Sequence, residues 1–227
     1  MIDLGDYLSS ELKAWQAHRE CVLHADTPSA ATLLYNARPL ALFGPGPVAE
    51  CFGVEMALEH ARRRAPVMLL SSQHDETIVD AIAATVARCQ PGRRVVVHRG
   101  NDRSSAAVDF SGVLESQESL YVSLPTMGKS TIALELGHSL LQQLTAALRD
   151  IVGPKGARGA LHPLVFVSEA CLFEVHYLQA LANVAEGVGV KLVYSLTHNS
   201  LGADWLRPWK QLAAGHELVR LGGATWA

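Results

Sequence analysis

Two segments of the 227-residue sequence have the residue types of a phosphate-binding loop. The first is LALFGPGPVAECFG at 40–53, where an apolar run passes through a Gly/Pro turn into a helical pattern. The second is SLPTMGKST at 123–131. In a GxxxxGK[ST] loop, backbone amides and a helix N-terminus surround the anion, the lysine neutralises the phosphates and the hydroxyl binds Mg²⁺. The two segments therefore compete for the same role.

The first segment keeps glycines but lacks the groups that bind a nucleotide. With Gly44 at the first position of the motif, Glu50 occupies the lysine position and Cys51 the Ser/Thr position. A carboxylate repels phosphate, and the prolines on either side of Gly46 remove two amide donors. We predict that this degenerate loop binds no nucleotide and is structural.

The second segment keeps the lysine and the hydroxyl but lacks a flexible loop. Ser123 stands at the first glycine position, and residues 124–127 contain no glycine, so this stretch has little torsional freedom to wrap a phosphate. A lysine and a Ser/Thr N-cap at a helix start explain the same residues. An active ATPase that uses Gly128, Lys129 and Ser130, with ATP and Mg²⁺ as cofactors, stays open as the alternative.

Two predicted strand ends carry further candidate residues. The run LVFV at 164–167 resembles Walker B, which continues with an aspartate for Mg²⁺ and a glutamate that activates water, but here Ser168 and Glu169 follow. Glu169 is thus a candidate general base, although a lone glutamate at a strand end is more commonly solvated or ion-paired. Thr197 and His198 could sense a γ-phosphate, and a polar turn explains them equally well. The histidines form no HExxH or HxH cluster, so we expect no metal.

The hydrophobic pattern predicts a sheet that would bring these segments together. Short apolar or β-branched runs alternate with longer helical patterns, which is typical of a parallel sheet covered on both faces. The expected strands are 39–44, 66–72, 94–98, 119–124, 163–169, 190–197 and 217–221, and the expected helices are 47–63, 76–89, 130–150, 172–187 and 203–214. The sequence thus predicts a three-layer α/β fold with a mainly parallel sheet.

The length and composition indicate one principal domain. The chain is 49% hydrophobic and 18% charged, the balance of a compact globular protein. Residues 1–36 are expected to form an N-terminal amphipathic helix, over 8–25, and a linker, because apolar side chains recur there at helical spacing. Residues 37–227 are expected to form the α/β domain.

Charge and cysteine spacing narrow the classes of partner and compartment. A net charge of −3 gives no general attraction to phosphate backbones, so direct nucleic-acid binding is not favoured, and Arg62–Arg64 is the compact basic run. The cysteines are too widely spaced for a CxxC site, no signal peptide is visible, and no apolar run approaches the roughly 20 residues that span a bilayer. We expect a cytoplasmic protein with no membrane span.

In order along the chain, the segments resemble the nucleotide-binding domain of the type IV coupling proteins, the TraD/TraG-like conjugation ATPases related to FtsK. The resemblance covers about 37–221 and rests on ARPLALFGPGPVAECFG, the Leu-Pro strand end in YVSLPTMGKS, the Walker B-like VFVSEA and the strand end in VYSLTHNSL. It implies a RecA-like P-loop NTPase fold. It also implies that the family's P-loop corresponds to Gly44–Cys51, which makes GKST a chance match.

The departures from the family's pattern imply a loss of catalysis. Glu50 and Cys51 replace the Walker A lysine and hydroxyl, Ser168 replaces the Walker B aspartate, and His198 replaces a glutamine. We expect neither the family's membrane anchor nor its all-helical insertion. The resemblance thus implies a pseudo-ATPase without a cofactor, a scaffold or accessory protein of a conjugation or mobile-element DNA-transfer (type IV secretion) system. Such a protein would act through a protein partner or self-association.

Overall fold

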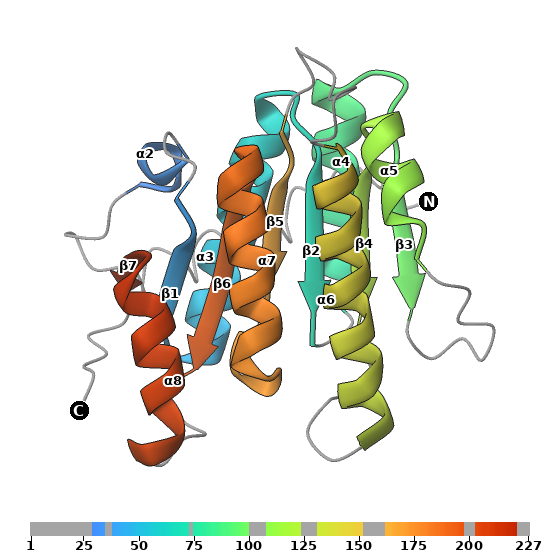
Figure 1. Cartoon of the computed structure of the whole chain (residues 1–227). Helices are drawn as coiled ribbons and strands as arrows, with labels where there is room; N and C mark the ends of the chain where they lie inside the picture. The colour runs from blue at the N-terminus through green and yellow to red at the C-terminus, as the bar shows by residue number, and fades with distance from the viewer. Residues whose placement is uncertain are drawn as a thin grey trace.

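The computed structural model describes residues 29–34, 38–72, 75–99, 108–123, 131–151, 162–197 and 203–221. Within these ranges the chain forms a seven-stranded sheet with helices on both faces (Figure 1). The expected N-terminal helix at 8–25 lies outside the described residues. No helix of the described ranges is long and apolar enough to cross a membrane.

Each pair of neighbouring strands in the sheet is parallel. The order is β3-β4-β2-β5-β6-β1-β7. The strands are β1 (Leu40–Gly44), β2 (Val67–Ser71), β3 (Val95–Arg99), β4 (Ser119–Ser123), β5 (Leu164–Val167), β6 (Lys191–Thr197) and β7 (Glu217–Arg220). All seven expected strands are present, and their ends differ from the prediction by at most two residues. The predicted three-layer α/β class with a parallel sheet is confirmed.

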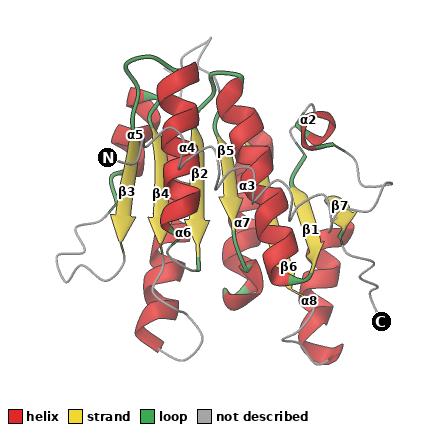
Figure 2. Ribbon diagram, turned by 180° about the vertical axis from the view of Figure 1, so that it is seen from behind, coloured by secondary structure: helices red, strands yellow, loops and turns green. Residues whose placement is uncertain are grey.

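The helices lie on the face that the direction of each crossover requires. Connections that lead toward β3 place their helix on one face, and connections that lead back place theirs on the other, because such crossovers are right-handed. The first face carries α2 (Ala30–Leu33), α3 (Gly46–Arg62) and α4 (Glu76–Cys89), and the second carries α5 (Phe110–Ser116), α6 (Thr131–Ile151), α7 (Val175–Val188) and α8 (Ala203–Ala214). Figures 1 and 2 show these faces from opposite sides.

The core consists of one apolar layer on each side of the sheet. Leu40 and Leu42 of β1 face α2–α4, whereas Ala41 and Phe43 face α5–α8. This alternation explains why the strands read as continuous apolar runs, since both faces are buried. On the α3 side the contact is very close at Gly53, where an added Cβ would lie 2.3 Å from the ring of Phe166 on β5. This contact sets the distance between α3 and the end of β5.

The structure contains two helices that the sequence analysis did not predict. They are α2 and α5, which have four and seven residues. The side chains of Ser29 and Asp109 cap them, and a helix so short shows little apolar periodicity. The helix expected from residue 172 begins instead at Val175, after a 3₁₀ turn at Ala170–Leu172.

Candidate functional site

Strand β1 passes into α3 with almost no loop. The strand ends at Gly44, Pro45 is the N-cap and the helix begins at Gly46, with Pro47 in its first turn. Because proline has no N–H, two of the four backbone positions that open the helix offer no donor to an anion. Residues 46–51, most of which would wrap the phosphate in a GxxxxGK[ST] loop, are helical here. This segment therefore forms no phosphate cradle.

Gly44 has a packing explanation that needs no phosphate. A Cβ at this position would lie 2.9 Å from the carbonyl oxygen of Leu221, which follows β7. The Leu221 N–H in turn donates to the Phe43 carbonyl at 2.8 Å. The glycine thus permits the close approach of two backbone segments.

The Glu50 carboxylate lies between the ends of two other strands. Its Oε1 accepts a hydrogen bond from Ser71 Oγ at the end of β2, at 3.0 Å, and one from Ser168 Oγ just after β5, at 3.2 Å. Both serines are buried, with 4% and 1% of their surface exposed. Glu50 can reach them because Gly53, one turn further along α3, packs directly against Phe166. The structure thus joins the predicted residues Glu50 and Ser168 in one contact.

This environment is unfavourable for additional negative charge. Burial raises the pKa of the Glu50 carboxyl above its ordinary value, the hydroxyls of Ser71 and Ser168 lower it, and Glu169 and Asp75 raise it again. Burial also raises the pKa of Tyr121, whose hydroxyl accepts a hydrogen bond from the Asp75 N–H at 3.2 Å. A phosphate that entered here would meet carboxylates where a nucleotide site presents a cation.

Glu169 is held by the neighbouring strands in a strained backbone conformation. Its φ of 47° lies in the left-handed region, which residues other than glycine seldom adopt. Its N–H donates to Ser195 Oγ on β6 at 2.7 Å, and its carboxylate accepts a hydrogen bond from Ser72 Oγ. Two hydrogen bonds therefore fix the candidate general base, one from its backbone and one to its side chain.

We refer to Glu50, Ser71, Ser72, Ser168, Glu169 and Ser195 as the strand-end cluster. The cluster lies where the chain changes faces, since β1 leads to α3 on one face and its neighbour β6 leads to α8 on the other. The same change occurs between β2 and β5. Parallel sheets bind ligands at such points, beyond the carboxyl ends of the strands. The cluster thus has the location of a ligand site but offers carboxylates and hydroxyls.

The remaining predicted residues are only partly described. Cys51 is half-buried beside Glu50 on α3, and Thr197 pairs with Gly44 in the register of β6 and β1, although its side chain is not described. His198 lies outside the described residues, as do the loop residues Gly128, Lys129 and Ser130.

The strand order does not decide between the two candidate loops. The central strand is β5, which leads to Ser168 and Glu169. One strand separates β5 from β1, which precedes Gly44–Cys51, and one strand separates it from β4, which precedes 124–130. Neither loop follows the central strand.

The sequence analysis missed Ser71, Ser72 and Ser195 as members of the cluster. A signal was present, because all three lie in the carboxyl-terminal halves of predicted parallel strands, whose ends meet at one edge of a sheet. What the sequence did not show is which strands are neighbours, so these serines could not be assigned to Glu50 and Glu169.

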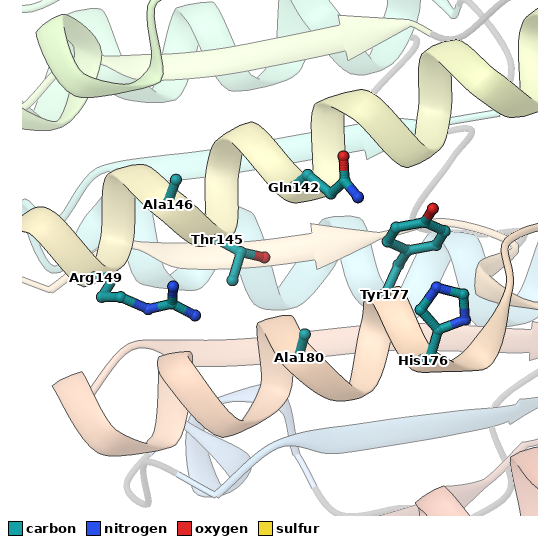
Figure 3. A pocket seen from close by; sticks show the side chains of 7 residues that line it. All are labelled: Gln142, Thr145, Ala146, Arg149, His176, Tyr177 and Ala180. Carbon is teal, nitrogen blue, oxygen red and sulfur yellow. The ribbon is translucent and has the colours of Figure 1, made fainter.

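A separate groove of about 340 Å³ lies between α6 and α7 (Figure 3). Gln142 and Tyr177 border one end, Arg149 borders the other, and the side chains of Ala146 and Ala180 lie between them. The groove shares no residue with the strand-end cluster. Among the described residues, no group of three His, Cys, Asp or Glu side chains is arranged to hold a metal ion.

Comparisons with known proteins yield a likeness in structure only. No family model matches the chain, and no curated protein matches it. Among solved structures, the chain is similar to the ATPase domain of another protein, with 15% identity and a TM-score of 0.45 over 95% of this chain and 81% of that chain. The sheet itself, rather than this likeness, establishes the α/β class. The relationship to the coupling proteins remains a prediction.

Proposed function

We propose that the protein is a pseudo-ATPase, a RecA-like domain that has lost nucleotide chemistry and acts by binding a protein partner or a second copy of itself. The observation that carries this proposal is the contact of the Glu50 carboxylate with Ser71 and Ser168. The contact fills the space between α3 and the ends of β2 and β5 with protein groups that satisfy one another.

The two altered positions are mutually compatible, which supports an adapted structure. A glutamate at the lysine position opposite an aspartate at residue 168 would bring two carboxylates together, and their repulsion would be costly. With Ser168 in place of that aspartate, Glu50 accepts a hydrogen bond at 3.2 Å instead. The cluster is therefore consistent as a polar packing element, whereas it lacks the cation and the metal-binding carboxylate that phosphoryl transfer requires.

The biological setting of the proposal comes from the resemblance to the coupling proteins alone. We place the protein in the cytoplasm, as a scaffold or accessory component of a conjugation or mobile-element DNA-transfer system. A fold hosts many functions, so this assignment rests on analogy and not on the geometry of the strand-end cluster.

Nucleotide titration tests the proposal. A fluorescent ATP analogue with Mg²⁺, titrated to about 1 mM, the upper end of ordinary enzyme affinities, should show no saturable binding to the full chain. Phosphate release should stay at the level of buffer. The matched variant is Lys129→Ala, which removes the lysine of the alternative loop and leaves the strand-end cluster intact.

Two results would contradict the proposal in different ways. Binding or turnover that disappears in Lys129→Ala would replace it with the active ATPase that uses Gly128, Lys129, Ser130 and Glu169. Binding that survives Lys129→Ala but changes in Glu50→Gln would place a nucleotide at the strand-end cluster after all.

A further inference from the structure

A basic surface lies at the amino ends of the strands, at the opposite edge of the sheet from the strand-end cluster. It consists of Arg62–Arg64 after α3, Arg88 in the last turn of α4, and Arg93 and Arg94 before β3. Figure 2 shows α3 and α4 on the near face, and the strand arrows point away from this edge. These six are almost a third of the chain's 19 lysines and arginines. We call them the arginine surface.

The two turns that carry these residues are tied together. The buried side chain of Gln90 donates from Nε2 to the carbonyls of Ala61 and Ala65, each at 3.0 Å. Arg93 Nη1 donates to the Arg64 carbonyl at 3.4 Å. The turns are therefore positioned before any partner binds, which reduces the conformational cost of association.

Local carboxylates neutralise part of the arginine surface but not all of it. Glu59 pairs with Arg62 and Arg63, at 3.2 and 3.5 Å, and Glu118 pairs with Arg94 at 2.7 Å. Within the described ranges, no carboxylate forms an ion pair with the three remaining arginines, which are Arg64, Arg88 and Arg93.

Helix dipoles account for only some of this charge. A cation near a helix C-terminus is favourable, which explains Arg62 on α3 and Arg88 on α4. Arg64, Arg93 and Arg94 lie beyond the helices, so the dipoles do not require them. A surface that gathers cations past the ends of two helices calls for another explanation.

We propose that the arginine surface binds an acidic segment of another polypeptide, whose carboxylates pair with Arg64, Arg88 and Arg93. The planar guanidinium group matches a carboxylate with two parallel hydrogen bonds, which lysine cannot offer. The inference goes beyond the proposed function, because it names the chemistry of a partner and does not depend on whether the strand-end cluster binds a nucleotide.

The observations favour an acidic polypeptide over a nucleic acid. Glu59 and Glu118 lie within the arginine surface and would repel a continuous run of phosphates, whereas the separate carboxylates of a peptide can avoid them. The net charge of −3 opposes the approach of a polyanion as a whole. The arginine surface also includes no aromatic side chain on which a base could stack.

Fluorescence anisotropy with a short fluorescein-labelled oligoglutamate tests the inference on the full chain. Binding should be measurable at low ionic strength and weaker near 0.15 M, about the physiological value. The double variant Arg64→Glu/Arg88→Glu should bind about tenfold more weakly or worse, which corresponds to about 1.4 kcal/mol. The matched control is Arg207→Glu/Arg220→Glu, which changes the net charge equally at exposed positions on α8 and at the end of β7.

Each result supports the inference or overturns it. Selective loss in the first double variant supports it, and equal loss in the control overturns it, because the effect would then follow net charge alone. Absence of binding at low salt overturns it. So does tighter binding of a single-stranded oligonucleotide that the same variant abolishes, since the surface would then serve phosphates. If the first variant fails to fold, Arg93→Gln removes one charge of the surface, and an unchanged affinity in that variant overturns the inference.

Discussion

Ser168→Asp would place a second carboxylate against Glu50 and should destabilise the fold. Ser168 Oγ lies 3.2 Å from Glu50 Oε1, and residue 168 is 1% exposed, so the new charge has no route to solvent. Two unit charges about 4 Å apart repel by about 4 kcal/mol at an effective dielectric constant of about 20. The pair can instead bind a proton, which at pH 7 costs about 4 kcal/mol from the ordinary pKa of a glutamate. We therefore expect the free energy of unfolding to fall by about 2–4 kcal/mol, since local relaxation lowers both limits.

The loss should depend on pH with a definite sign. In the folded variant each carboxylate raises the pKa of the other, whereas in the unfolded chain both have ordinary values near 4. Between the unfolded and the folded pKa the folded state binds more protons, so stability falls as the pH rises. The variant should approach the stability of the wild type as the pH decreases toward the ordinary carboxyl range.

Urea denaturation between about pH 5 and pH 8 measures this effect. The matched control is Ser168→Asn, which has nearly the size of aspartate without its charge. Glu50→Gln combined with Ser168→Asp should recover most of the loss, because the glutamine amide can donate to the new carboxylate. An Asp variant as stable as the wild type at pH 8, or equal losses for Asp and Asn, would refute the contact between residues 50 and 168.

The remaining predictions concern packing and pH. Gly53→Ala should cost about 1–3 kcal/mol, because the new Cβ would lie 2.3 Å from the Phe166 ring, whereas Gly187→Ala on α7, with no atom within 4 Å, should gain about 0.5–1 kcal/mol. Equal thermal melting of the two variants would contradict the close α3–β5 contact. Burial lowers the pKa of His216, whose Nδ1 lies 2.7 Å from the Tyr194 hydroxyl, and so stability should decrease as the pH falls below the ordinary histidine pKa of about 6.5. His216→Gln should flatten this decrease in pH-dependent urea denaturation, and an unchanged slope would exclude His216 as its source.

The sequence by itself determined the secondary structure and its class. Each strand is an uninterrupted apolar run because both faces of the sheet are buried, as Leu40–Phe43 show, and each long helix has a wide apolar stripe. These patterns are local, so they can be read without knowing what packs against them. The degenerate character of residues 44–51 was also visible, because charge and the absence of amide donors belong to the residue types themselves.

Only the tertiary structure decided what the altered residues do. Glu50 and Ser168 are 118 residues apart, and their contact depends on the order of the strands and on the closeness of α3 to β5. Whether β1 would lead into a loop or directly into a helix was equally undecided, since Gly and Pro are found in both. The arginine surface has the same origin, because the hydrogen bonds of Gln90 join two turns that lie well apart in the sequence. Strand order and helix packing depend on contacts between distant segments, and such contacts leave no periodicity in a single sequence.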